Sequence, residues 1–246
     1  MTDERPATST ISILLGTEEK PQLIRWTTWW DSPGSWDSYA LVTTDGPVLV
    51  DPETLTSDGE QRLLSLLGST PRVTVLTNDM HERAAYAYKE KWGAPVHAPA
   101  YGSLYDGIPD HLYRHGDTLP GSLGAHKLDG GAFPGDTVLI WKLQDERRVL
   151  FTGDALNGGF NRLNPAGPHP RRGEPGLYLG AGPFYLERCT SDWLKTSLRA
   201  LLDAPIYMIA GAHGDPITAD ANDSLARLLD IDWEPLLKEK QFPVAR

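Results

Sequence analysis

Four side chains able to do chemistry follow one short apolar run in the sequence VTVLTNDMHER, residues 73–83. The run ends at Thr77, and the side chains after it are those of Asp79, His81, Glu82 and Arg83. Imidazole and carboxylate groups bind metal ions or transfer protons, and a guanidinium binds carboxylates. A loop held between a strand and a helix keeps such groups in place, so this stretch is a candidate active site.

Three further polar side chains also come directly after apolar runs. Asp51 follows PVLV, Asp154 follows LFTG and His213 follows IAGA. Such runs are typical of strands, and polar residues at strand ends commonly line a pocket. We therefore expect these three side chains and the 77–83 loop to be walls of one site.

The elements that would position these residues alternate along the chain. Apolar and β-branched runs predict strands over 11–15, 22–30, 73–76, 94–99, 124–131, 136–143, 147–154 and 204–211, and a hairpin over 38–53. Helical spacing predicts helices over 57–67, 81–92, 190–203 and most of 219–240. This order predicts an α+β fold of two paired sheets with helices outside them. We expect a disordered N-terminus over residues 1–10 and a single domain over 11–246.

Composition narrows the function classes. The net charge of −10 argues against nucleic acid as a partner, because phosphates are bound by clustered Lys and Arg. The one cysteine, Cys189, cannot form an internal disulfide, and no stretch resembles a signal peptide or a membrane span. We therefore expect a cytoplasmic protein with a small-molecule ligand and no membrane partner; a homodimer is compatible with the sequence.

The segments LVDPE, FTGDAL and GAHGDP, in this order and at these distances, resemble the metallo-β-lactamase superfamily over nearly the whole chain. The resemblance implies a four-layer αββα sandwich with the active site at one edge of its two sheets. It also implies that Asp154 is a metal-bridging carboxylate, that His213 is a metal ligand and that Asp51 supports the 77–83 loop. In that family one or two zinc ions activate a water molecule for hydrolysis.

This chain departs from the pattern where most of the zinc ligands would be. The family's loop reads T-H-x-H-x-D-H, whereas this one reads T-N-D-M-H-E-R, with Asn78, Met80, Glu82 and Arg83 at the four ligand positions. Ala132 stands where a further histidine is expected. Only Asp154 and His213 remain, and two ligands do not hold two zinc ions. The sequence therefore predicts that the dinuclear centre is not retained.

Two questions about this loop stay open. Arg83 either takes the vacated metal position and pairs with Asp154, or points to solvent. If the Arg83 guanidinium lies inside the site, about 5 Å from a metal dication, the two charges repel each other by on the order of 6 kcal/mol. A single ion would need a shifted loop in which Asp79 or His81 joins Asp154 and His213; otherwise His81 begins a helix that Asp79 caps. We expect no cofactor or one zinc, with the metal-free site favoured.

Substrate contacts are predicted from two segments. Trp30 and Trp36 flank a turn that is a flap over the substrate in the resembling family, although they could equally cover the sheet. His169 and Arg171, in the Gly- and Pro-rich segment 157–183, could bring cations to an anionic substrate or form a solvated surface.

Two functions follow from these residues. The first is a hydrolase-like enzyme acting on a small ester, thioester or lactone, with Asp154, His213, His81, Glu82 and Arg83 as its polar machinery. The alternative is a non-catalytic relative that binds a small molecule or acts as a scaffold with a metal-free pocket. Fold alone cannot separate them.

Overall fold

The computed structural model describes residues 8–29, 35–103, 105–159, 176–180, 183–239 and 244–245. Within these residues the first sheet has seven strands in chain order. They are β1 (Thr8–Gly16), β2 (Pro21–Trp29), β3 (Ser35–Leu41), β4 (Val48–Val50), β5 (Val73–Val75), β6 (Val96–Pro99) and β7 (His111–Tyr113). Strands β1 to β4 pair antiparallel and β4 to β7 pair parallel, so β4 and β5 end at the same edge.

The second sheet of the described chain has the strand order β14-β11-β10-β9-β8, and β11 runs parallel to β14. Its strands are β8 (Thr118–Leu119), β9 (Leu123–Lys127), β10 (Thr137–Lys142), β11 (Arg148–Gly153) and β14 (Ile206–Gly211), with a 3₁₀ turn, η1 (Pro120–Ser122), between β8 and β9. A smaller sheet joins β12 (Leu156–Asn157), β13 (Leu177–Leu179) and β15 (Val244–Ala245).

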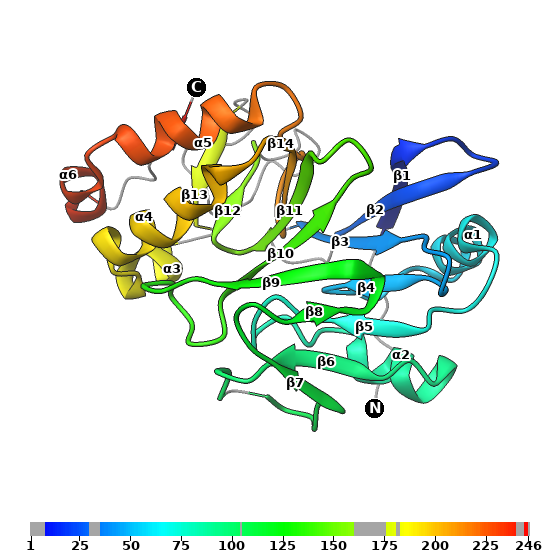
Figure 1. Cartoon of the computed structure of the whole chain (residues 1–246). Coiled ribbons are helices and arrows are strands. Elements are labelled where there is room, and N and C mark those ends of the chain that lie inside the picture. Colours follow the sequence, from blue (N-terminus) through cyan, green and yellow to red (C-terminus); the bar gives the residue numbers. More distant parts are fainter. Residues whose placement is uncertain are drawn as a thin grey trace.

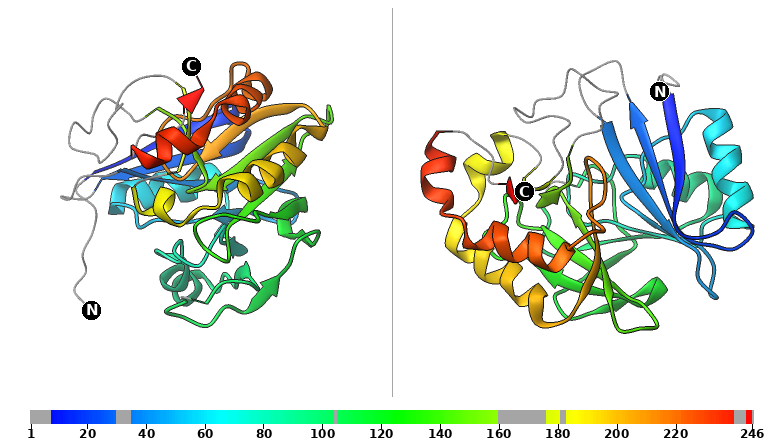
Figure 2. Two further views of the ribbon diagram at one scale, coloured as in Figure 1. Left: turned by 90° about the vertical axis from the view of Figure 1, so that its left-hand side faces the viewer. Right: turned by 90° about the horizontal axis from the view of Figure 1, so that it is seen from above.

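Helices lie on the outer faces of the two large sheets (Figures 1 and 2). The first sheet is covered by α1 (Ser57–Leu67) and α2 (Ala85–Trp92). The second is covered by α3 (Pro183–Arg188), α4 (Ser191–Arg199), η2 (Ala200–Asp203), α5 (Ala221–Asp230) and α6 (Trp233–Lys238). The fold is therefore the predicted four-layer αββα sandwich. No helix in the part of the chain that the structure describes is long and apolar enough to cross a membrane.

Alternating side chains build these layers, because successive residues of a strand point to opposite faces of a sheet. Leu23 of β2 packs between the two sheets and Ile24 packs under the outer helices. In β11, Val149 joins the layer between the sheets and Leu150 joins the layer under α4 and α5. Apolar runs buried on both faces therefore hold the two sheets together and hold their helices to them.

The structure corrects two expectations about local elements. Helix α2 begins at Ala85, so His81 does not begin a helix and Asp79 does not cap one. The physical reason is Arg83, whose φ of 40° lies in the left-handed region and interrupts any helix that begins at His81. At the N-terminus, β1 begins at Thr8, inside the stretch expected to be disordered; residues 1–7 lie outside the described part.

Candidate functional site

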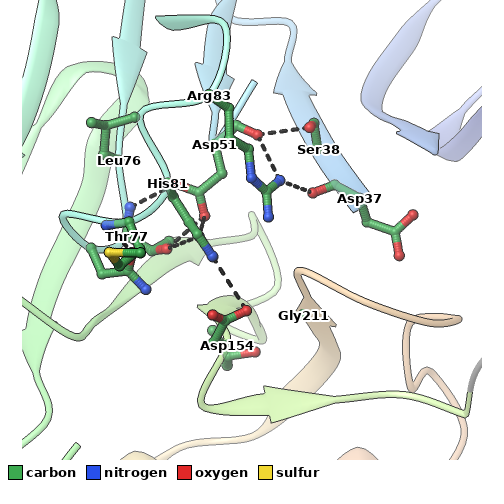
Figure 3. A network of polar contacts seen from close by, with 12 residues as sticks. Asp37, Ser38, Asp51, Leu76, Thr77, His81, Arg83, Asp154 and Gly211 are labelled. Carbon is green, nitrogen blue, oxygen red and sulfur yellow. Dashed lines mark hydrogen bonds and ion pairs between the residues drawn. The ribbon is translucent and has the colours of Figure 1, made fainter. Parts of the chain in front are cut away.

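The polar residues predicted to share a site do come from adjacent strand ends. Asp51 follows β4 and the 77–83 loop follows β5, its parallel neighbour in the first sheet. Asp154 follows β11 and His213 comes two residues after β14, and these strands are parallel neighbours in the second sheet. Each sheet thus contributes two segments to one cluster of polar contacts, and Figure 3 shows the part of it around Asp51, His81 and Asp154.

Asp51 fastens the loop after β5. Its Oδ1 accepts a hydrogen bond from the Thr77 amide at 2.7 Å, and its Oδ2 accepts one from the Thr77 hydroxyl at 2.6 Å. The Nδ1–H of His81 donates to the same Oδ2 at 2.8 Å. These contacts orient the His81 ring, so that its Nε2 faces Asp154 (Figure 3).

Gly153 permits the close approach of the two sheets at this point. A Cβ atom at Gly153 would lie 2.4 Å from the Thr77 hydroxyl oxygen, and the φ of this residue is 52°. A larger residue would therefore push Asp154, the next residue, away from the 77–83 loop.

The centre of the site is the Asp154 carboxylate, which lies between two imidazole rings. Its Oδ1 is 3.3 Å from Nε2 of His81 and 3.3 Å from Nε2 of His213. The other ring nitrogen of His213, Nδ1, donates to the Ser35 carbonyl oxygen at 2.6 Å. The two distances from Asp154 Oδ1 to the imidazole rings are longer than the 2.7–2.9 Å of a charge-assisted hydrogen bond. The buried Oδ1 of Asp154 makes no hydrogen bond of ordinary geometry. Asp154 and the two rings are therefore in electrostatic contact.

Charge strongly shifts the pKa values of this cluster. Burial and the Arg83 guanidinium lower the pKa of His81, but the carboxylates of Asp51 and Asp154 outweigh them and raise it from 6.5 to about 9. Burial alone would raise the pKa of Asp154; His81 and His213 instead hold it well below its usual range. At neutral pH an imidazolium therefore lies between two carboxylates.

The His81 shift predicts a pH-dependent stability. Because its pKa is raised on folding, its stabilisation is fully present below pH 6.5 and is lost as the pH rises through about 9. We expect the free energy of unfolding of the wild-type protein to fall by on the order of 3 kcal/mol more than that of His81→Gln across this window. Urea unfolding at several pH values measures the difference; equal pH dependence in the two proteins would contradict it.

Arg83 adopts neither of the two expected positions. Its Nη1 donates to the main-chain carbonyl oxygens of Asp37 at 3.0 Å and Asp51 at 3.2 Å (Figure 3). It joins the loop after β5 to the main chain of β3 and is only partly exposed. The side chains next to the Asp154 carboxylate are instead those of His81 and His213.

The acidic residues of the loop point elsewhere. Oδ2 of Asp79 accepts from the Ser103 amide at 2.8 Å, and the carboxylate of Glu82 accepts from the amides of Asp106 at 2.6 Å and Gly107 at 3.2 Å. Both therefore tie the 77–83 loop to the segment that precedes β7. None of these contacts involves the Asp154 carboxylate, so they give no support to roles for Asp79 and Glu82 as catalytic or metal-binding groups.

The structure describes only one of the four residues predicted to contact a substrate. Trp36 is half-buried in β3. Its predicted contact with a substrate stays a prediction. Trp30, His169 and Arg171 lie outside the described residues.

Several polar residues of the site were missed. Arg25 and Asp37 form a buried pair beside the His213 loop, and the lone charge in the apolar run QLIRWTTWW was the signal that could have revealed it. Asp136 is also buried, where it accepts from the Asn78 amide at 3.2 Å. Burial, with the charge of Asp154, raises the pKa of Asp136 to about 7.

The donor set does not fit the dinuclear metal centre that the fold implies. Asn78 is bonded to Asp136, the half-exposed Met80 offers only a thioether, and Arg83 brings a positive charge. The structure does bring together His81, Asp154 and His213, the set that a single ion would need; beyond them, the part of the chain that the structure describes offers no group of three His, Cys, Asp or Glu side chains arranged to hold a metal ion. With no ion bound, His81 supplies a positive charge next to Asp154.

Comparison with solved structures defines the class of fold. Metallo-β-lactamase DIM-1 is similar with a TM-score of 0.64 and 13% identity over 92% of this chain and 99% of that one. The mono-zinc form of the metallo-β-lactamase FIM-1 from Pseudomonas aeruginosa has a TM-score of 0.61 and 14% identity, over 92% and 97%. A di-iron-bound form of TTHA1623 has a TM-score of 0.52 and 22% identity, over 80% and 94%.

The chain therefore has the metallo-β-lactamase fold. At these identities the similarity establishes the architecture and does not establish an activity. No family model matches the sequence, and no curated protein matches it either.

Proposed function

We propose that this chain is a hydrolase-like protein that cleaves a small ester, thioester or lactone by acid–base chemistry, without a metal ion. The observation that carries the proposal is the position of Asp154 Oδ1, 3.3 Å from the Nε2 atoms of both His81 and His213. Hydrolysis needs one group that accepts a proton from water and one that donates a proton to the leaving group. Two imidazoles that share one carboxylate supply both.

The roles follow from the contacts of each ring. His213 donates through Nδ1 to Ser35, so its Nε2 is the atom that takes a proton as water attacks the carbonyl carbon, and Asp154 stabilises the imidazolium formed. His81 is already an imidazolium and gives its Nε2 proton to the departing alkoxide or thiolate as the bond to carbon breaks. The products are an acid and an alcohol or thiol, or a hydroxy acid from a lactone. The proton held by His213 returns to His81 through solvent.

The second candidate, a non-catalytic binding protein, is favoured by one observation. Each ring has both nitrogens in contact with a partner: Asp51 and Asp154 for His81, and Ser35 and Asp154 for His213. A group that must also serve water and substrate would have to exchange one of these partners. The two candidates therefore differ in whether the rings give up a contact when a ligand binds.

The test is a panel of chromogenic esters, thioesters and lactones assayed with EDTA and with added zinc. We expect turnover that EDTA does not change, and about a 100- to 10,000-fold loss of kcat in His213→Ala. Asp110→Asn is the matched control, because Asp110 pairs with Lys89 at the other end of the first sheet. Elemental analysis is expected to find less than about 0.1 equivalent of metal in the purified protein.

Each arm has an outcome that overturns part of the proposal. Stoichiometric zinc that is lost in His213→Ala, or turnover that requires zinc, would overturn the metal-free chemistry. Absence of turnover over the whole panel would overturn catalysis and leave the binding protein.

A further inference from the structure

The loop that carries His213 is held by the first sheet at four consecutive residues. The Tyr39 hydroxyl donates to the Gly211 carbonyl at 2.6 Å, and the Asp37 amide donates to the Ala212 carbonyl at 2.8 Å. His213 itself donates to the Ser35 carbonyl, and Arg25 donates to the Gly214 carbonyl at 3.0 Å. Strands β2 and β3 therefore determine where this loop of the second sheet lies.

Arg25 connects strand β3 to the part of the loop that follows His213. Its Nε and Nη2 donate to the two oxygens of Asp37, each at 2.9 Å, in a forked pair. Its Nη1 donates to Asp215 Oδ1 at 2.9 Å, on the far side of His213. Arg25 and Asp37 are both buried, whereas the Asp215 side chain is 67% exposed. A buried, bidentate guanidinium is rigid, and lysine cannot reproduce its geometry.

We propose that Arg25 is a positioning residue that sets the orientation of the His213 ring. The fork fixes the Asp37 side chain in β3, two residues from the Ser35 carbonyl that accepts from His213. The other two bonds hold Gly214 and Asp215, so His213 lies between two points that are both fixed to one guanidinium. The effect of Arg25 on catalysis rests on the function proposed above, whereas its effect on the orientation of the His213 ring does not.

The experiment compares Arg25→Lys and Asp215→Ala with the wild-type protein. Arg25→Lys keeps the charge and loses the fork, whereas Asp215→Ala removes only the exposed partner and leaves the Arg25–Asp37 pair. Arg148→Ala is the matched control, because Arg148 is also a mostly buried arginine paired with an exposed aspartate, Asp203, at the opposite end of β11. The readouts are the Nδ1–H proton resonance of His213 in protein with ¹⁵N-labelled histidine, and kcat and KM separately.

The hydrogen bond to Ser35 should make the Nδ1–H resonance visible in the wild-type protein and in Arg148→Ala. We expect it to shift in Asp215→Ala and to be lost in Arg25→Lys, with about a 10-fold or greater fall in kcat and little change in KM. An unchanged resonance in folded Arg25→Lys would overturn the inference. If Arg25→Lys does not fold, an unchanged resonance in Asp215→Ala overturns it.

The resonance also separates the two proposals. If the wild-type protein hydrolyses no substrate but the resonance changes as expected in the two variants, the proposed function is overturned and Arg25 is still the residue that orients His213. If the wild-type protein hydrolyses a substrate but the resonance does not change in the variants, the role of Arg25 is overturned and the proposed function stands.

Discussion

Replacing His81 with alanine is expected to lower the free energy of unfolding by about 3–5 kcal/mol at pH 7. The imidazolium lies between the carboxylates of Asp51 and Asp154, and all three side chains are largely buried. Asp51 keeps its two hydrogen bonds from Thr77, but Asp154 loses its nearest positive charge. A carboxylate left in that position either stays ionised without compensation or takes up a proton, and both are unfavourable.

A double-mutant cycle with Asp154→Asn separates this effect from simple loss of packing. If the charge of His81 serves mainly to compensate Asp154, then alanine at position 81 should destabilise the Asp154→Asn protein by at least 1 kcal/mol less than it destabilises the wild type. His97→Ala is the control, because His97 is a partly buried ring of β6 that packs against the His111 ring. Additive effects in the cycle, or a loss no larger than that of the control, would show that the imidazolium is not compensating a buried charge.

Local sequence signals predicted some elements to the residue. Helix α1 spans Ser57–Leu67 as expected, because the Thr56 side chain accepts from the Gly59 amide at its start and Gly68 takes a φ of 68° at its end. The start of α2 could not be predicted in this way. It depends on the left-handed conformation of Arg83, whose guanidinium is held by carbonyls of β3 and of Asp51, far away in the sequence.

The same distinction applies to the site. The positions of Asp51, Asp154 and His213 at strand ends were predictable, since a polar residue after an apolar run ends a strand. The partner of each side chain was not, because it depends on how two sheets approach at Gly153. Arg25 shows this most clearly: its contact with Asp215 joins residues 190 positions apart, and no periodicity records it.

Restoring the ligand residues of the fold is expected to create a zinc site. The variant carries Asn78→His, Met80→His, Glu82→Asp, Arg83→His and Ala132→His, together with His81→Ser so that the present partner of Asp154 is removed. Asp154 already lies beside His81, and His213 already contacts Ser35, so the strand ends of the two sheets meet at the site. We expect a zinc Kd below about 1 μM, against weaker than about 1 mM in the wild-type protein, a change of about 4 kcal/mol.

The contribution of charge is measured by a matched variant that keeps Arg83 and carries the other five substitutions. A guanidinium about 5 Å from a zinc ion would repel it by on the order of 6 kcal/mol at an effective dielectric near 20, so this variant should bind much more weakly. Competition titration with a chelator of known affinity gives both constants. Equal affinities would show that Arg83 stays on the carbonyls of Asp37 and Asp51 and out of reach of the ion. Weak binding by both would show that the 77–83 loop, fastened by Thr77 to Asp51, holds the new side chains in the wrong directions.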